Sequence, residues 1–353
     1  MESISRMYKF NTVDEISLLT STTDEETKAL LEKGVNPNTK DREGHTPLIN
    51  ARTPGQVKML LEAGADPNVE SDNGETPLSD ATTGEAIILL LKAGVDPNKK
   101  NKFGETPILG NYFDEKVKLL LEAGADPNVI DSEGNTPLIN ASNEYQTKIL
   151  LHAGCDPNAK NNKGVTSLMN SNNGTQIKLL LAAGADLNAT DEDGNNALHH
   201  CVNICQIKAL LEAGADPNKS NDEHLTPLHS QFGSPDKIKL FLEYGANPNA
   251  RDIYGQTPLM YTTKEETIKL LLEAGADPNA KDEDGKSVIQ KSRNEDKIKL
   301  LIEAGAIKDS DSSSDDDYRY YGERGTYYDE DGDPFDLNNG ANWDGDQQIG
   351  FRD

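Results

Sequence analysis

The residues best suited to metal chemistry lie close together between positions 199 and 205. They are His199, His200, Cys201 and Cys205, and imidazole and thiolate are common ligands of Zn²⁺. A zinc site needs three or four such ligands that converge as a tetrahedron. The cluster therefore predicts either a zinc centre, with enzyme chemistry at His199, His200 and Cys205, or a set of structural side chains. The position of these residues in the predicted secondary structure distinguishes the two alternatives.

A second pattern, near the C-terminus, has the spacing of a calcium-binding loop. Asp329, Asp331 and Asp333 resemble its first ligands, but Pro334 replaces the required glycine and Gly340 replaces the closing glutamate. This departure excludes an EF-hand.

Motifs and composition argue against an enzyme. The chain lacks the phosphate-binding, dinucleotide-binding, serine-hydrolase and zinc-protease motifs, so we expect no catalytic residues and no cofactor. Its 61 acidic and 35 basic residues give a formal charge of −26, which repels phosphate backbones and anionic lipid headgroups. We therefore expect no direct binding to nucleic acid or to membranes.

One phrase, LLEAGADPN or a near copy, recurs along most of the chain. It begins at Leu30, Leu60, Leu90, Leu120, Leu150, Leu180, Leu210, Phe241 and Leu271, with a truncated copy at Leu301. The period is 30 residues except for one step of 31, and a Thr-Pro-Leu phrase keeps step with it. A fixed period of this length indicates a supersecondary unit stacked on itself, because a single unit cannot bury its apolar face alone.

The unit contains two helices and a turn. Thr46 and Pro47 suit the N-cap and first position of a short helix that runs to about Arg52. A second helix is predicted from Gln56 to Ala63, and Gly64 suits the left-handed residue that ends it. The Asp-x-x-Gly segment between units has the signature of a type I turn and predicts a hairpin-like finger. We expect an all-α repeat solenoid.

The combination of TPL, LLLEAGADPN and Asp-x-x-Gly resembles the ankyrin repeat, over roughly residues 10–306 and about nine to ten units. The resemblance implies a protein-binding scaffold. The family unit has about 33 residues, whereas this one has 30, and the missing three lie between Ala51 and Val57. Their loss predicts a shorter first helix or a tighter turn. Shortened units are similar to those in ankyrin proteins of large DNA viruses, intracellular bacteria and some protists.

The repeat register favours the structural alternative for the histidine and cysteine cluster. His199 stands where the family often has a structural histidine, Cys201 matches Ala51 and Cys205 matches Gly55. We therefore expect no metal there. One unit carries an insertion near Gly233 and has His224 in place of the finger glycine, which predicts a local distortion between residues 221 and 236.

Three regions are predicted along the chain: an N-terminal capping repeat at 1–38, the ankyrin array at 39–306 and an acidic, Tyr-rich disordered tail at 307–353. The tail has 14 acidic and four basic residues, a net charge of −10. Such a composition predicts disorder, and the tail acts either as a solubiliser, as a recognition segment or as a cover for the last repeat. The recognition hypothesis rests on Tyr320, Tyr321, Tyr327, Tyr328, Phe335 and Trp343.

The binding surface implied by the family geometry is a concave face lined by the finger tips. The tip residues vary between units while the framework residues repeat, so the tips are free to specify a partner. Large or basic side chains make the candidate contacts, since interface energy concentrates in a few anchors. They are Arg42, Lys102, Phe103, Ile253, Tyr254 and Tyr261.

We expect a non-enzymatic scaffold or adaptor that modulates a host or cellular protein with a basic or mixed-charge surface. The alternative is an acidic nucleic-acid mimic that blocks a DNA- or RNA-binding protein. The three cysteines are too few for a disulfide framework, and no apolar run approaches a signal peptide or a membrane span. These features predict a monomeric, soluble, intracellular protein of the cytoplasm or nucleus, or of a host cell if the source is a virus or an intracellular bacterium.

Overall fold

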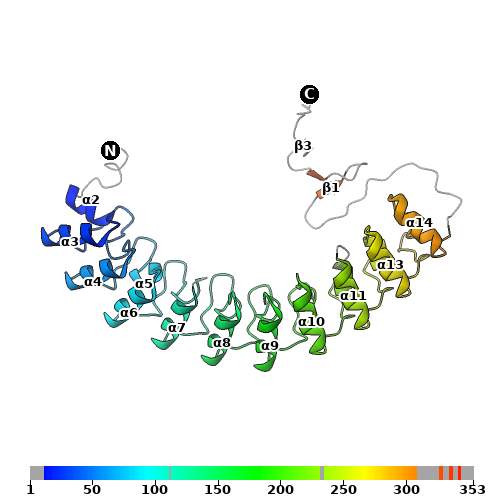
Figure 1. The fold of residues 1–353 in the computed structure, drawn as a ribbon, viewed down its shortest axis with the longest axis horizontal. Coiled ribbons are helices and arrows are strands. Elements are labelled where there is room, and N and C mark those ends of the chain that lie inside the picture. The colour runs from blue at the N-terminus through cyan, green and yellow to red at the C-terminus, as the bar shows by residue number, and fades with distance from the viewer. Residues whose placement is uncertain are drawn as a thin grey trace. The chain divides into compact units, whose positions relative to one another are not determined.

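The computed structural model of the 353-residue chain describes residues 12–110, 113–230 and 234–307, together with the backbone of three short strands between 326 and 342. The chain divides into two compact units, Met1–Ala306 and Ile307–Asp353. The first unit contains all the helices of the described residues, and these stand one after another in a curved row (Figure 1).

A nine-residue helix ends in the first three residues of the LLEAGADPN phrase each time the phrase occurs. These second helices of the repeats are α3 (Asp24–Glu32), α4 (Pro54–Glu62), α6 (Gly84–Lys92), α7 (Asp114–Glu122), α8 (Glu144–His152), α9 (Gly174–Ala182), α10 (Ile204–Glu212), α11 (Pro235–Glu243), α13 (Glu265–Glu273) and α14 (Glu295–Glu303). Neighbouring second helices pack against each other along the row. The predicted all-α solenoid is confirmed.

The second helix begins two residues earlier than the sequence predicts. Thr53 is its N-cap and accepts the backbone N–H of Gln56 at 3.1 Å, and Pro54 occupies the first helical position. The Gln56 side chain closes a capping box by accepting the N–H groups of Arg52 (2.9 Å) and Thr53 (3.2 Å). The predicted start at Gln56 is wrong because this second Thr-Pro pair is itself a helix start.

The first helix is reduced to about one turn in most units. After Thr46 and Pro47 the turn ends with the Asn50 N–H bonded to the Thr46 carbonyl at 3.1 Å, so the predicted extension to Arg52 is wrong. Regular first helices are α2 (Val13–Leu19), α5 (Pro77–Asp80) and α12 (Pro258–Tyr261), and Pro227–Ser230 forms a 3₁₀ helix. The shortening predicted from the 30-residue period is therefore confirmed.

The core is a single cluster that runs through the whole array. Its centre is the first residue of each recurring phrase. Leu30 is 7 % exposed, and the exposed fraction is 0–2 % for Leu60, Leu90, Leu120, Leu150, Leu180, Leu210, Phe241, Leu271 and Leu301. They pack with the Leu or Ile of the Thr-Pro phrase in one contiguous hydrophobic cluster. Each unit therefore completes its core with the side chains of its neighbours.

The polar end of the phrase joins consecutive units. Gly64 has φ +87° after α4, and its carbonyl accepts Asn38 Nδ2 of the preceding phrase at 3.0 Å. The Asn38 side-chain oxygen accepts the Asp66 N–H at 2.7 Å. The same pair of bonds recurs from Asn98, Asn128, Asn158, Asn218 and Asn249. In these six phrases the asparagine thus binds the following unit.

A buried side chain at the third position of the second helix makes another link. Gln176 Nε2 donates to the Ala141 carbonyl (3.2 Å) and the Thr147 hydroxyl (3.1 Å) of the preceding unit. In α7 this position is Lys116, which is fully buried and donates to the carbonyls of Ser79 (2.7 Å) and Ala81 (3.1 Å). Burial lowers the pKa of Lys116 to about 8.

The distortion predicted around His224 is absent from its finger. His224 has φ +57°, and it is the one residue other than glycine with positive φ among the described residues. Its N–H donates to the Asn221 carbonyl at 3.0 Å, as the glycine does elsewhere. His224 therefore adopts the left-handed conformation that glycine adopts in the neighbouring fingers. Residues 231–233, at the insertion, lie outside the described residues.

The second unit contains three short antiparallel strands, which the composition of the tail does not predict. They are β1 (Thr326–Tyr328), β2 (Pro334–Asp336) and β3 (Ala341–Asn342), in the order β1-β2-β3. Tyr327 pairs with Phe335, and Phe335 pairs with Asn342. The other tail residues from 308 onward lie outside the described residues.

Candidate protein-binding surface

Each finger is a tight turn held by the side chain of its first residue. Asp131 Oδ1 accepts the backbone N–H groups of Glu133 (2.9 Å) and Asn135 (2.8 Å). Partial burial would raise the pKa of Asp131, but hydrogen bonds from Asn135, Glu133 and Asn140 outweigh it and hold the pKa below its ordinary value. Gly134 closes the turn with φ +79°. Ser132 and Glu133 are left exposed at the tip.

In four of the five fingers that begin with aspartate, the other oxygen of that side chain accepts a hydrogen bond from the residue nine positions later. The pairs are Asn140 with Asp131 (3.4 Å), His200 with Asp191 (2.7 Å), Tyr261 with Asp252 and Lys291 with Asp282 (2.5 Å). Tyr261 also meets the edge of the His229 ring, with centroids 5.8 Å apart. Its hydroxyl is therefore engaged and its ring is half-buried. The structure places Tyr261 in the framework of its finger and away from the exposed tips.

The fingers are also bonded to one another. The N–H of the first tip residue donates to the carbonyl of the second tip residue in the preceding finger: Asp222 to Asp193 (3.0 Å), Ile253 to Glu223 (3.0 Å) and Glu283 to Tyr254 (2.9 Å). Equivalent bonds join Asp72 to Glu43, Lys102 to Asn73, Asn162 to Glu133 and Glu192 to Lys163. Side chains that are 30 residues apart in sequence therefore become neighbours along a row.

The remaining predicted contacts are exposed at finger tips. Arg42 and Lys102 are exposed, and the exposed fractions are 68 % for Phe103, 61 % for Tyr254 and 38 % for Ile253. These residues do not form one patch. The finger of Phe103 and that of Tyr254 are five units apart, on the order of 40–50 Å at about 8–10 Å for each packed helix.

Acidic residues at neighbouring tips flank Ile253 and Tyr254, although they are not among the contacts predicted from the sequence. The neighbouring tips are Glu192 and Asp193, Asp222 and Glu223, and on the other side Glu283 and Asp284, all exposed. The bonds between fingers place four of these carboxylates on one side of the Ile253 and Tyr254 tip and two on the other side. Their alignment could have been found by stacking the sequence at its period of 30, because the tip positions then fall in one column.

The cluster between 199 and 205 is held by contacts within the framework. His199 Nδ1 lies 2.8 Å from Asn196 Oδ1, and its Nε2 lies 3.0 Å from the Leu225 carbonyl. Burial lowers the pKa of His199. Cys201 is buried with its thiol on the Ala197 carbonyl, whereas Cys205 is exposed. Within the described residues these side chains do not converge on a common point.

The predicted recognition residues of the tail are described only in part. Tyr327 and Tyr328 lie in β1 and Phe335 lies in β2. Tyr320, Tyr321 and Trp343 lie outside the described residues. Tail recognition therefore stays a prediction.

Comparison with known proteins identifies the repeat. A family model described as ankyrin repeats (3 copies) matches residues 20–101, 83–161, 142–221 and 203–282. No curated protein matches the chain. None of the helices in the described ranges is both long enough and apolar enough to cross a bilayer. Ankyrin repeats are generally protein-interaction modules and are typically non-enzymatic. With the matched residues covering well over half of its length and the stacked two-helix units described above, the chain belongs to the ankyrin-repeat family.

Proposed function

We propose that this protein is a non-enzymatic scaffold or adaptor that binds a basic segment of another protein along the finger tips between residues 191 and 286. The observation that carries the proposal is the row of six exposed carboxylates around Ile253 and Tyr254. Carboxylates attract a basic partner and speed its encounter, while an aromatic anchor supplies affinity at short range.

The charge of the tips is unevenly distributed, which favours this part of the row. The tips of Arg42 with Glu43 and of Asn162 with Lys163 carry mixed or positive charge. The tips of the 191–195 and 221–225 fingers carry four carboxylates and no basic residue. Hydrogen bonds between the fingers fix the spacing of these tips before a partner arrives, which reduces the entropy lost on binding.

Selection of displayed peptides on the immobilised full-length chain tests the proposal. Enriched peptides should carry an excess of Lys and Arg and at least one apolar side chain, and their binding should weaken in 1 M salt. The variant E192K/D193K/D222K/E223K should lose them. A matched control reverses four exposed glutamates on the second helices, Glu32, Glu62, Glu122 and Glu273, and should retain them. Enrichment of neutral or acidic peptides would contradict the proposal.

The nucleic-acid mimic makes a different prediction for the same surface. A mimic needs rows of carboxylates, so its binding should depend on charge alone and should survive Tyr254→Ala. Partners captured by the wild-type chain would then be displaced by duplex DNA. Loss of binding on Tyr254→Ala favours the scaffold, because duplex DNA offers no aromatic anchor at its surface.

A further inference from the structure

The 41–45 finger contains the one group of three metal-ligating side chains that converge among the described residues. These are Asp41, Glu43 and His45, with Nδ1 of His45 lying 3.3 Å from Asp41 Oδ2 and 3.5 Å from Glu43 Oε2. Ligand atoms around a tetrahedral Zn²⁺ with bonds of about 2.0–2.1 Å lie about 3.3–3.4 Å apart. Both distances from His45 Nδ1 are therefore near the spacing that zinc requires, and the two carboxylate oxygens lie within 4.8 Å of each other.

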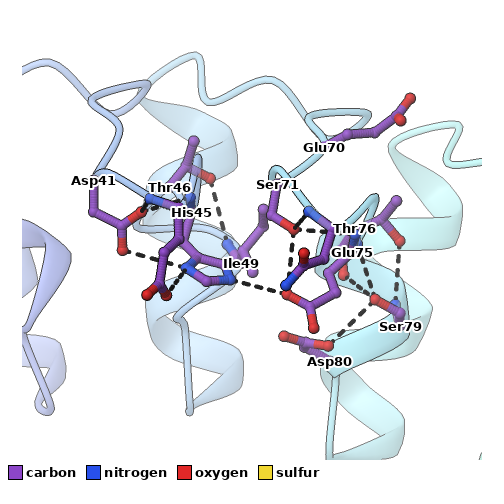
Figure 2. Close-up of polar contacts among 12 residues, drawn as sticks. Asp41, His45, Thr46, Ile49, Glu70, Ser71, Glu75, Thr76, Ser79 and Asp80 are labelled. Atoms are coloured by element: carbon purple, nitrogen blue, oxygen red, sulfur yellow. Dashed lines mark hydrogen bonds and ion pairs between the residues drawn. The ribbon is translucent and has the colours of Figure 1, made fainter. Parts of the chain in front are cut away.

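A third carboxylate, from the next finger, orients the ring. His45 Nε2 lies 2.9 Å from Glu75 Oε2, so a proton on Nε2 is donated to this carboxylate (Figure 2). Metal-bound histidines usually donate their other ring N–H to a carboxylate or carbonyl, which fixes the tautomer and raises the basicity of the ligand nitrogen. With the proton on Nε2, Nδ1 presents a lone pair toward Asp41 and Glu43. Figure 2 shows His45 between Asp41 and Glu75, with dashed contacts to both sides of the ring.

A lone pair that faces two carboxylates is repulsive unless a cation lies between them. A proton on Nδ1 is one cation that relieves the repulsion. A divalent metal ion relieves it more fully, because it also satisfies the carboxylates directly.

Comparison with the 131–135 finger shows what is unusual at His45. There Asn135 occupies the same position, and its Nδ2 donates to Asp131 Oδ2 (3.0 Å) and Glu133 Oε2 (3.3 Å). The amide is a permanent donor, so the two carboxylates are satisfied without a cation. Replacing the amide by imidazole keeps the geometry and converts the donor into a potential ligand.

Asp41 also lacks the framework donor found at other fingers. Nine positions later stands Asn50, whose Nδ2 donates to the Leu19 carbonyl at 3.1 Å instead. Among the described residues, His45 Nδ1 is the contact made by Asp41 Oδ2. The Asp41 side chain is nevertheless only 12 % exposed. Glu43 is 67 % exposed, which leaves the outer side open for water as a fourth ligand.

We propose that Asp41 Oδ2, Glu43 Oε2 and His45 Nδ1 bind a divalent transition-metal ion of the zinc class, with Glu75 as the residue that positions the ring. The ion takes the place of the missing framework donor on Asp41. It also ties the 41–45 finger to the 71–75 finger through the His45 to Glu75 hydrogen bond. The site is structural in kind, because it lies at the end of the array and away from the acidic tips between 191 and 286.

Equilibrium dialysis of the untagged full-length chain against zinc alone, followed by elemental analysis, tests the proposal. The wild-type chain should retain one more zinc ion than His45→Asn or Glu43→Gln. His45→Asn reproduces the side chain that the 131–135 finger already uses, so it should fold. Glu75→Gln should weaken zinc binding about 10- to 100-fold. Glu133→Gln, at the same tip position in the Asn135 finger, is the matched control and should bind like wild type.

Two results would overturn the site. One is equal zinc in the wild-type chain, His45→Asn and Glu43→Gln. The other is a loss in Glu133→Gln as large as that in Glu43→Gln, because zinc would then be held by exposed acidic residues in general. Nitrogen-15 NMR of the ring gives an independent measurement: on addition of zinc, Nδ1 should shift to the metal-bound position while Nε2 stays protonated. A ring that keeps protons on both nitrogens at saturating zinc would show an imidazolium ion pair instead.

Discussion

The repeats between residues 131 and 225 and the repeat at 101–130 have the same helices but are joined to their neighbours differently. In the first region, the Asn162, Glu192 and Asp222 N–H groups each bond the preceding finger at 2.9–3.0 Å. The second helices there begin with asparagine N-caps, and buried glutamines reach back to the preceding unit. Each joint is thus held at its finger and at its helix start.

The 101–130 repeat is held more loosely on its C-terminal side. Within the described residues, no bond joins the Ser132 N–H to the Phe103 carbonyl, and a Cβ added at Gly104 would meet open space. A Cβ added at Gly134 would lie 2.9 Å from the Asn162 N. The asparagine bonds across this joint, from Asn128, are 3.4 and 3.3 Å long. This joint therefore lacks the bond between fingers and has longer asparagine bonds than the joints of Asn98 and Asn158, so we expect it to be weaker than those two joints.

Replacing one buried leucine by alanine in each region should have the largest effect on stability. The two losses together test whether the joint after the 101–130 repeat is weaker. Leu180→Ala in the regular region should lower the free energy of unfolding by about 3–5 kcal/mol, because its surroundings are bonded on both sides and cannot collapse into the cavity. Leu120→Ala in α7 should cost only about 2–3 kcal/mol, since the neighbouring joint can close around it. Urea unfolding with amide hydrogen exchange locates each loss. Equal costs would contradict a weaker joint.

The buried lysine of α7 gives a pH-dependent contrast with the regular glutamines. The pKa of Lys116 is about 8 in the folded chain and about 10.5 when unfolded, so the unfolded chain binds more protons between these values. Stability should therefore rise with pH across this window by up to about 3 kcal/mol. Lys116→Met should lose that rise, whereas Gln176→Met in the regular region should keep it.

The comparison must be made as a difference between variants measured at the same pH. Burial raises the pKa of both Cys155 and Cys201 to about 12, which destabilises the fold above pH 9 in every variant. Lys297 has a pKa of about 8 for the same reason as Lys116 and remains in each variant. Both contributions cancel in the difference. The prediction would be contradicted if the free energy of unfolding changed with pH in the same way for the wild-type chain and for Lys116→Met.

The two exposed aromatic tips, Phe103 in the 101–130 repeat and Tyr254 in a finger bonded on both sides, extend the comparison to binding. Tyr254→Ala should weaken binding of a selected basic peptide about 10-fold, or about 1.4 kcal/mol, because its finger is bonded on both sides and is ordered before binding. Phe103→Ala should change binding of that peptide less than about 2-fold. Both variants should keep the stability of the wild-type chain within about 0.5 kcal/mol, since neither side chain is buried. Fluorescence anisotropy measures the affinities, and an equal loss in both variants would place the partner elsewhere.

The sequence predicts the framework well because its physical causes are local. Pro47, Gly64 and the leucine at position 60 determine a helix start, a helix end and a buried face within a single unit, and the period repeats them. The length deficit between Ala51 and Val57 likewise predicts the shortened first helix. The second helix starts two residues before its predicted start because Pro54 takes the first helical position after the Thr53 N-cap.

The parts that could not be predicted depend on contacts between units. Nothing local to Tyr261 indicates that its hydroxyl meets Asp252, and nothing local to Lys116 indicates the Ser79 and Ala81 carbonyls that it binds. The arrangement around His45 needs Glu75, which lies 30 residues away and becomes a neighbour only when the fingers stack. Framework residues recur in the sequence at the period of 30. A side chain that joins two units depends on a partner in the neighbouring unit, so neither residue alone predicts the contact.

The smallest predicted effect is a change in stability at His224. It tests whether the bonds between fingers hold the backbone conformation of this finger. His224 holds φ +57° in a finger bonded on both sides, through the Asp222 N–H to Asp193 and the Ile253 N–H to Glu223. A left-handed conformation costs a residue with a Cβ about 1–2 kcal/mol, whereas glycine loses about 0.5–1 kcal/mol of backbone entropy. His224→Gly should therefore stabilise the chain by about 0.5 kcal/mol in thermal unfolding, with unchanged hydrogen exchange at Asp222 and Ile253. A destabilised variant would mean that the imidazole itself contributes to the finger, and the bonds between fingers would then be weaker than the regular region requires.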